Sequence, residues 1–385
     1  MLNIIEAGFN EDENVLASAV GRLLEHEGGA RAARSARDQA FGFDAQRWTK
    51  ITEAGWLAAL VPPERGGLGM GMAEFAIILE QCGRHLVCEP VAAAACAAWL
   101  LGSVLAAPVN ALREALLQSL LTEGALVTPV ISPDAIHPIR YSGAPGGGII
   151  DGRIFGVADV GPAAALLVAA SSADGPVIVS LGRHEPGMSV TLTEAVDGCP
   201  LADIVFSRTP VGTAQVLASG AEAEHLLRAC VARLRVAAAA ELAGLSAGAF
   251  ALAVDYLKVR QQFGRPIGSF QVLKHAAVDD LSELFRARAL LHAVARAMSD
   301  PDASGSDGGA LAAAVKAFNS RVALRICKSC VQMHGAIGYT DEHDAGLYLK
   351  RAMSLAARHG NAGACEATFE TAFSGSRRTS TGAFV

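Results

Sequence analysis

The sequence has few charged and few aromatic residues. Of its 385 residues only 18% are Asp, Glu, Lys or Arg and only 5% are Phe, Trp or Tyr, whereas 51% are hydrophobic. The formal net charge is −6, so the basic excess that a nucleic-acid-binding protein usually carries is absent. We therefore expect no nucleic-acid partner. The surplus of alanine and aliphatic residues favours a helix-rich globular protein with a sizeable core.

The sequence also lacks an obvious leader or membrane span. Residues 1–6 carry no basic segment followed by a long apolar run, so we expect no signal peptide and a cytoplasmic location. The apolar stretch 91–112 contains Gly102, Ser103 and Pro108 and is rich in alanine, which indicates a buried helix and no membrane contact.

Cysteine usage gives no sign of a metal site. The eight cysteines are scattered along the chain, and we expect them to be reduced and mostly in the core. Cys327 and Cys330 form a single CxxC pair, and no second pair lies nearby to complete the four ligands that zinc needs. We predict two thiols on one helix face and no bound metal.

The hydrophobic pattern divides the chain into three parts. Helical spacing dominates residues 1–121 and returns in long segments over 216–385, such as 225–258, 270–299, 310–333 and a fourth helix from 346. Between 122 and 215, short apolar runs alternate with turn residues, which is typical of strands. We predict an α+β protein: an N-terminal all-α domain (1–121), a central antiparallel β-sandwich or barrel (122–215), and a C-terminal four-helix bundle (216–385).

Two glycine-punctuated polar clusters lie in the C-terminal half. In the first, a helix ends near Arg260, the chain turns through Gly264-Arg265-Pro266, and a new helix begins near 269. An arginine at a helix end can bind a phosphate through two hydrogen bonds. In the second cluster, Gly335 and Gly338 allow a ligand to approach the backbone closely.

Three segments in order resemble the acyl-CoA dehydrogenases, which are flavoenzymes of fatty-acid and related β-oxidation. They are Gly55-Trp56 with Val61-Pro62-Pro63-Glu64-Arg65-Gly66-Gly67-Leu68-Gly69, residues 256–271, and residues 332–339. The resemblance covers nearly the whole chain. It implies an acyl-CoA substrate, FAD as cofactor, α,β-desaturation of the thioester, and an electron-transfer flavoprotein as acceptor.

The resemblance also implies which residues bind the cofactor. In relatives a shared FAD site receives its adenosine and pyrophosphate contacts from across a dimer interface. The matching positions in this chain are Arg260, Gln262, Phe263, Gln271, Gln332 and Gly335.

The flavin-cradling half of that site departs from the family pattern. Residues 128–134 contain no glutamate where relatives have Thr-Glu-Pro, and residues 153–158 contain no tryptophan where relatives place one along the flavin. Phe155 is the aromatic residue at that place.

The catalytic base stays open. At the commonest family position His359 replaces the glutamate, and at the alternative position Leu234 stands before Arg235, which matches an arginine near the thioester in relatives. Glu241 is a second candidate, although an ion pair inside the bundle, with Arg235 or Lys274, would also explain it. Histidine can act as a base near neutral pH, but it is not the choice of the family.

A chain with one half of a shared site suggests a partner. Residues 342–351 further resemble the bacterial branch that acts on steroid and other bulky acyl-CoA substrates, where α2β2 heterotetramers are known. We hypothesise a subunit that completes the flavin site of a homologous partner chain. Two alternatives remain: a self-sufficient homotetrameric enzyme with an unusual base, and a structural subunit without catalysis.

Overall fold

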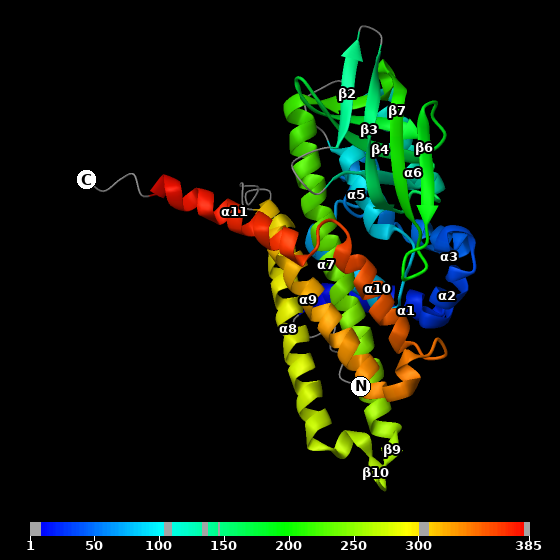
Figure 1. The fold of residues 1–385 in the computed structure, drawn as a ribbon, viewed down its shortest axis with the longest axis vertical. Coiled ribbons are helices and arrows are strands. Elements are labelled where there is room, and N and C mark those ends of the chain that lie inside the picture. Colours follow the sequence, from blue (N-terminus) through cyan, green and yellow to red (C-terminus); the bar gives the residue numbers. More distant parts are fainter. Residues whose placement is uncertain (1–8, 104–109, 133–137, 145–146, 300–307, 381–385) are drawn as a thin grey trace. The chain divides into compact units, whose positions relative to one another are not determined.

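The computed structural model describes residues 9–103, 110–132, 138–144, 147–299 and 308–380. Along the chain, helices precede one eight-stranded sheet and helices follow it, which confirms the predicted α+β order (Figure 1). The residue boundaries that we predicted for three domains stay a prediction. The contacts divide the chain into two compact units. Unit 1 comprises Met1–Arg34, Met72–Val87 and Arg235–Val385, and unit 2 comprises Ser35–Gly71 and Cys88–Leu234.

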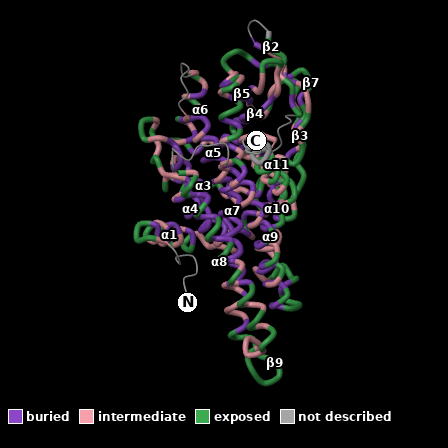
Figure 2. The backbone as a smooth tube through the Cα atoms, turned by 90° about the vertical axis from the view of Figure 1, so that its left-hand side faces the viewer, coloured by how far each residue is buried: buried purple, intermediate pink, exposed green. Residues whose placement is uncertain are grey.

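Unit 1 is a helical assembly in which α4 contacts α1 and α8, and α9 contacts α8, α10 and α11. Helix α7 begins in unit 2 and enters unit 1 at Arg235. It is buried along most of its length, and the turn that follows it is exposed (Figure 2). The helices are α1 (Glu11–His26), α2 (Gly29–Arg37), α4 (Met72–Arg84), α7 (Gly220–Val259), α8 (Gln271–Ser299), α9 (Gly308–His334), α10 (Ala345–Ala357) and α11 (Ala362–Ser380).

The four helices predicted for the C-terminal part are present as α7 to α10. A fifth, α11, was not predicted and lies against α9, where Cys365 packs on Ala313 and Ala317. The predicted helical C-terminal part is confirmed, and α11 adds a helix to the four that were expected. The small, polar composition of 362–380 concealed the helix, because the apolar contacts that stabilise it lie in its first turn.

Helices α4 and α7 approach each other so closely that only glycine fits between them. A Cβ atom on Gly244 would lie 1.9 Å from the carbonyl oxygen of Glu80, and one on Gly83 would lie 2.0 Å from that of Glu241. No side chain larger than hydrogen can occupy either position without separating the helices.

A buried carboxylate stabilises the neighbouring contact between α4 and α8. Glu80 accepts hydrogen bonds from Arg288 Nε at 2.9 Å and Nη2 at 3.2 Å, and His292 Nε2 lies 3.1 Å away. Burial alone would raise the pKa of Glu80, but the charges of Arg288 and His292 hold it below its ordinary value. A paired carboxylate of this kind is costly to break, because either charge alone would stay buried.

Unit 2 contains the sheet, whose hydrogen-bonded order is β6-β7-β3-β2-β4-β5-β8 with β1 beside β4. Figure 1 shows β2, β3, β7 and β6 side by side. The strands are β1 (Val127–Val130), β2 (Ile139–Ala144), β3 (Gly147–Ala158), β4 (Ala165–Ser172), β5 (Gly175–Gly182), β6 (Met188–Thr193), β7 (Leu201–Gly212) and β8 (Val216–Ser219).

The sheet is mixed, so the prediction of a purely antiparallel β domain was wrong. Strand β1 pairs with β4 in parallel over four residues, and β2 meets β4 in parallel at Arg140 and Ser171. The intervening β2–β3 hairpin gives the chain enough length to return for a parallel pairing. Among the described strands, β6 and β8 end the pairing path without closing it into a barrel.

The helices of unit 2 are α3 (Ala45–Glu53), α5 (Val91–Gly102) and α6 (Ala111–Glu123), and α5 packs on β1. Helix α5 is 12 residues long, which is too short to cross a bilayer. By length and composition α7 could span one, but 89% of its most apolar window is buried inside the protein. Core helices of folded proteins share these properties.

We expect Gly244→Ala to lower the free energy of unfolding by about 3 kcal/mol, because the new methyl group forces α4 and α7 apart. Gly309→Ala is the matched control, since this helical glycine has nothing within 4 Å of its Cβ position, and it should gain about 0.5–1 kcal/mol. Denaturant titration followed by circular dichroism measures both. Equal effects of the two substitutions would contradict this view of the crossing.

Candidate functional site

The turn between α7 and α8 is a short β-hairpin at the end of unit 1. Strands β9 (Gln261–Gln262) and β10 (Arg265–Pro266) pair antiparallel, with Gln262 opposite Arg265. The two loop residues, Phe263 and Gly264, have φ angles of 53° and 76°. Two positive φ angles in a two-residue loop are typical of a type I′ turn.

Phe263 is unusual in both conformation and exposure. A bulky aromatic residue rarely adopts a positive φ angle, and such strain often marks functional sites. Its side chain is 89% exposed and makes an edge-on contact with Phe270, at 6.1 Å between ring centroids. Water therefore surrounds an apolar ring at the tip of the hairpin, next to Arg260 and Gln262, which are also exposed.

The end of α9 lies beside this hairpin. The ring of His334 packs at a tilt against the rings of Tyr256 and His343, with 4.4 Å and 4.2 Å between the ring centroids. Tyr256 is four residues before Arg260, and His334 directly precedes Gly335. This ring contact brings the two glycine-punctuated clusters of the sequence to one end of the helical unit.

All six predicted cofactor-binding residues are exposed. They lie either near the ring contact between His334 and Tyr256 or on the first turn of α8. Gly335 has a φ of 66° and nothing within 4 Å of its Cβ position, so a ligand can reach its backbone. His334, only 3% exposed, donates from Nδ1 to the carbonyl of Cys330 at 2.7 Å. Its Nε2 is buried and has no hydrogen-bond partner among the described residues. The six are Arg260, Gln262, Phe263, Gln271, Gln332 and Gly335.

The loop after α10 contains His359, with a φ of 58°. Two basic side chains bind main-chain carbonyls in and before this loop. Arg235 Nε donates to the carbonyl of His359 at 3.1 Å, and Lys316 Nζ donates to the carbonyl of Ala356, in the last turn of α10, at 3.1 Å. Arg235, the predicted substrate residue, is buried and serves here to hold the backbone.

The surroundings of His359 are positively charged. Burial, followed by the positive charges of Lys316, Arg358 and Arg235 in that order, lowers the pKa of His359 to about 3. Lys316 is fully buried, and burial lowers its own pKa to about 8. An imidazole with so low a pKa is a weak proton acceptor at neutral pH. The geometry thus does not favour His359 as a catalytic base.

Glu241 lies elsewhere in the bundle. Its Oε2 is 3.4 Å from Arg351 Nη2, and both side chains are buried. Arg351 Nη2 also lies 3.5 Å from the carbonyl of Val87. We predicted an ion pair as an alternative role for Glu241, and the structure confirms that it forms one. Its partner is Arg351, which the sequence did not indicate.

The sheet in unit 2 offers few side-chain groups that could hold the flavin half of the cofactor. Thr128 is buried and its hydroxyl donates to the carbonyl of Asp159 at 2.8 Å, so the hydroxyl is occupied internally. Phe155 is exposed on β3, with the guanidinium of Arg153 5.3 Å from its ring centroid. Residues 133–137 of this segment lie outside the described residues.

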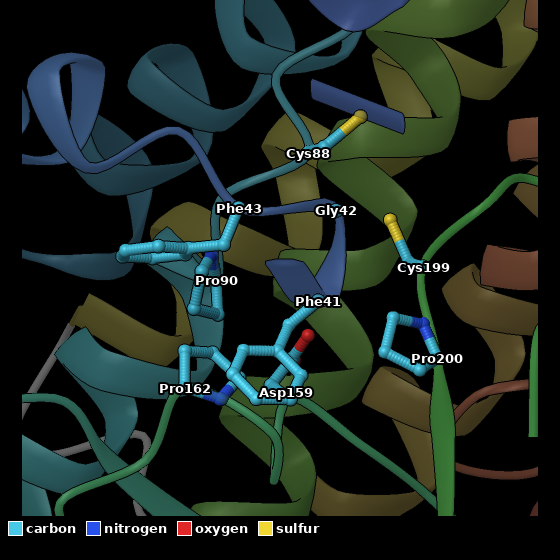
Figure 3. A pocket seen from close by; sticks show the side chains of 9 residues that line it. All are labelled: Phe41, Gly42, Phe43, Cys88, Pro90, Asp159, Pro162, Cys199 and Pro200. Carbon is cyan, nitrogen blue, oxygen red and sulfur yellow. The ribbon is translucent and has the colours of Figure 1, made fainter. Parts of the chain in front are cut away.

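A small cavity in unit 2 lies between two phenylalanines and a group of prolines (Figure 3). Its volume is about 10 Å³, enough for about one water molecule. An acyl group therefore does not fit it. The lining residues are Phe41, Gly42, Phe43, Cys88, Pro90, Asp159, Pro162, Cys199 and Pro200.

Comparison with known proteins decides the family. The model of the acyl-CoA dehydrogenase N-terminal domain matches residues 10–123, and that of the C-terminal domain matches 225–366. Acyl-CoA dehydrogenase IpdE2 of Mycolicibacterium smegmatis is 30% identical over 353 residues, which are 89% of this chain and 93% of that protein. The chain belongs to the acyl-CoA dehydrogenase family.

Solved structures share the acyl-CoA dehydrogenase fold. The Tcur3481-Tcur3483 steroid ACAD G363A variant superposes with a TM-score of 0.85 and 23% identity, covering 96% of this chain and 99% of that one. The ChsE4-ChsE5 complex from Mycobacterium tuberculosis has the same TM-score and 20% identity, covering 95% and 98%. The predicted fold family is therefore confirmed.

Acyl-CoA dehydrogenases are FAD-dependent oxidoreductases that act on a CH–CH bond, and the hairpin end of this chain fits part of that cofactor. The exposed guanidinium of Arg260 and the open backbone at Gly335 suit a polar ligand with phosphate groups. They would hold the adenosine diphosphate portion. Unit 2 shows no equivalent set of donors in its described residues.

Sequence reasoning missed two residues, one beside the hairpin and one beside His359 in the loop after α10. His334 lies inside the quoted motif, but only the fold shows that its ring packs on Tyr256. Lys316 is a single lysine in an otherwise apolar stretch of α9, and that isolation was the available signal. A lone charge within an apolar run indicates either a buried partner or a special environment.

We expect the imidazole of His359 to remain neutral down to about pH 4, because its folded pKa is about 3. An unfolded histidine has a pKa of about 6.5, so the unfolded chain binds more protons as the pH falls from 6.5 to 3 and stability decreases in that window. His359→Gln should make the pH dependence of unfolding shallower there. The exposed His184→Gln is the control.

Two-dimensional NMR of the imidazole carbons measures the same property directly. Lys316→Met should raise the pKa of His359, because it removes the neighbouring positive charge. An imidazole that titrates near pH 6.5 in the unmodified protein would contradict this account and restore His359 as a possible base.

Proposed function

We propose that this chain is a subunit of a FAD-dependent acyl-CoA dehydrogenase. The assembly catalyses α,β-desaturation of an acyl-CoA thioester. In it the chain completes the flavin site of a homologous partner chain in an α2β2 heterotetramer, and the partner supplies the flavin-cradling sheet and the catalytic carboxylate.

The exposed hairpin between α7 and α8 carries this proposal. An apolar ring that is 89% exposed, in a strained conformation and beside an exposed arginine, costs free energy unless another molecule covers it. The hairpin belongs to the segment that the family uses across a subunit interface. Phe263 is thus expected to be buried in the assembly.

The residue at the expected position of the catalytic base supports a partner whose sequence differs from that of this chain. A second copy of this chain would bring His359, whose neighbours Lys316, Arg358 and Arg235 are all basic. It would also bring a sheet in which, among the described residues, the Thr128 hydroxyl already donates to the carbonyl of Asp159. A homologue with an intact base position can supply what this chain lacks.

The cofactor, when bound, accepts the hydride that leaves the β carbon of the substrate. This chain contributes binding and orientation. The Arg260 guanidinium neutralises pyrophosphate charge through paired hydrogen bonds, and the amides of Gln262, Gln271 and Gln332 satisfy polar atoms of the nucleotide. Phe263 excludes water from the covered end, and Gly335 allows close approach of its backbone.

The names of solved structures with the same fold support the proposed substrate class, and the family resemblance supports the proposed acceptor. One structure of the same fold is described as a steroid ACAD, and another is a complex of two differently named chains. We propose a steroid-derived or similarly bulky acyl-CoA as substrate and an electron-transfer flavoprotein as acceptor, which places the chain in lipid and steroid catabolism.

The visible absorbance of the purified protein, alone and co-expressed with a homologous acyl-CoA dehydrogenase chain encoded beside it, tests the proposal. We expect a colourless lone protein and a yellow mixed assembly with one flavin for each pair of unlike chains. A stoichiometric flavin spectrum from the lone protein would refute the shared site and favour a self-sufficient homotetramer.

Arg260→Ala in the mixed assembly should weaken FAD binding roughly 30-fold, because one charge-assisted contact of about 2 kcal/mol is lost. Fluorescence titration of FAD into the deflavinated assembly measures this. Arg228→Ala is the matched control, since that arginine is an exposed residue of the same helix with only a weak pair to Glu224. Unchanged flavin affinity in both variants would support a structural subunit that does not touch FAD.

A further inference from the structure

Two cysteines line the small cavity of unit 2. Cys88 lies in the loop between α4 and α5, and Cys199 lies in the loop between β6 and β7. Figure 3 shows both sulfur atoms at the upper right of the cavity, and none of the other labelled side chains lies between them. Two residues that are far apart in the sequence thus bring their thiols to one water-sized space.

Cys88 differs from the other cysteines in its exposure. All eight cysteines are thiols in the structure, and Cys88 is the one that is not buried. Burial raises the pKa of Cys230 and of Cys330 to about 12, and it also raises the pKa of Cys365. A thiol reacts only when it is accessible and can form a thiolate. Cys88 is therefore the thiol that an oxidant in solution reaches first.

A buried guanidinium lies close to Cys88. Arg47 forms an ion pair with Glu89, in which Nη2 donates to Oε1 at 2.9 Å and Nε lies 2.8 Å from Oε2. Burial lowers the pKa of Arg47, but the charge and hydrogen bond of Glu89, followed by the charge of a Cys88 thiolate, raise that pKa above its ordinary value. Since the attraction between two charges is mutual, the guanidinium stabilises a thiolate at Cys88.

The backbone around the cavity is strained. Phe41 and Asp159, which line the cavity, have φ angles of 65° and 64°, and Leu86, just before Cys88, has a φ of 54°. Three of the six non-glycine residues with a positive φ in the described chain therefore lie at this cavity or next to it. Strain of this kind concentrates at functional sites, which distinguishes the cavity from an ordinary packing defect.

The two cysteines lie in loops that can adjust to a bond between them. Neither Cys88 nor Cys199 belongs to a helix or strand, so a small shift of either loop breaks no regular backbone hydrogen bonds. The Cys199 loop packs closely on Gly42, where a Cβ atom would lie 2.9 Å from the carbonyl oxygen of Gly198. A disulfide requires Cα atoms within about 7 Å of each other, and this packing holds the loop at the cavity that Cys88 also lines.

We propose that Cys88 and Cys199 form a redox-sensitive thiol pair that hydrogen peroxide converts to a disulfide. The Cys88 thiolate attacks one oxygen of the peroxide, and the O–O bond breaks. Cys88 becomes a sulfenic acid, and the departing hydroxide takes up the proton that Cys88 released. The Cys199 sulfur then attacks the sulfenic sulfur, so that the S–S bond forms, the S–O bond breaks, and a second water leaves with the Cys199 proton. The thiols lose two electrons, which the peroxide accepts.

The proposed bond acts within unit 2. It ties the loop before α5 to the loop before β7, and a disulfide between distant residues stabilises a fold mainly by restricting the unfolded chain. A dithiol reductant reverses it by thiol–disulfide exchange. The proposal uses no residue of the hairpin or of the loop after α10, so it is independent of the proposed flavin site.

Peptide mapping of the full-length protein tests the pair. The protein is treated with hydrogen peroxide, and its remaining thiols are then alkylated under denaturing conditions. We expect two fewer alkylated cysteines than in the untreated protein, together with a cross-linked pair of tryptic peptides that contain Cys88 and Cys199. Dithiothreitol should restore alkylation at all eight cysteines.

Substitutions separate this pair from the neighbouring thiols. Cys88→Ser and Cys199→Ser should each abolish the cross-link. The tryptic peptide that carries Cys88 also contains Cys96, so Cys96→Ala is the matched control and should leave the cross-link intact. Peroxide should raise the midpoint of thermal unfolding by roughly 5 °C in the unmodified protein and in Cys96→Ala, and should leave it unchanged in Cys199→Ser.

Three results would overturn the proposal. One is alkylation of all eight cysteines after peroxide treatment. Another is oxidation of Cys88 to a sulfinic or sulfonic acid while Cys199 stays reduced. The third is a cross-link from Cys88 to a different cysteine or to a second copy of the chain, which peptide mapping and a non-reducing gel would reveal.

Discussion

The close approach of α4 and α7 is the constraint on which the helical unit depends. Where Gly83 and Gly244 meet the carbonyls of Glu241 and Glu80, the two backbones are separated by no side chain at all. The approach also sets the position of Glu80, which binds Arg288 and His292 on α8. One crossing thereby fixes the spacing of three helices, of which α7 and α8 carry the hairpin between them, and Arg235 of α7 binds the carbonyl of His359.

Charge is distributed unevenly over the ends of this unit. The hairpin end presents an exposed arginine, amides and an open glycine, all of which suit a phosphate-bearing ligand. At the loop after α10, the neutral His359 lies among three basic residues, which suits the abstraction of a proton poorly. This distribution of charge is the basis for our proposal that the chain contributes cofactor contacts and that a partner supplies the base.

The α7–α8 pair has apolar surface in two places that a monomer leaves in water. Phe263 lies at its tip, and Val278 with Phe285 lies on the outer face of α8. The tip is strained and adjoins polar ligand-binding groups, whereas the outer face is regular and uncharged along its centre. The opposite face of α8, which includes Leu284, Ala287 and Leu291, packs into unit 1.

The sequence by itself determined the order of helices and strands, the family, and the turn between a helix ending near Arg260 and a helix beginning near 269, because glycine, proline and hydrophobic spacing act locally; that the turn is a β-hairpin came from the structure. It did not predict the parallel pairing of β1 with β4 or the helix α11, since both depend on contacts between distant segments. The six proposed cofactor residues were identified from a motif, whereas the packing of His334 on Tyr256 and the partner of Glu241 emerged only from the fold. Arg358 adjoins His359 in the sequence, but the other two charges around it were decided by tertiary structure, because Arg235 and Lys316 are far from His359 along the chain and the electrostatic effect of a charge depends on its distance in space.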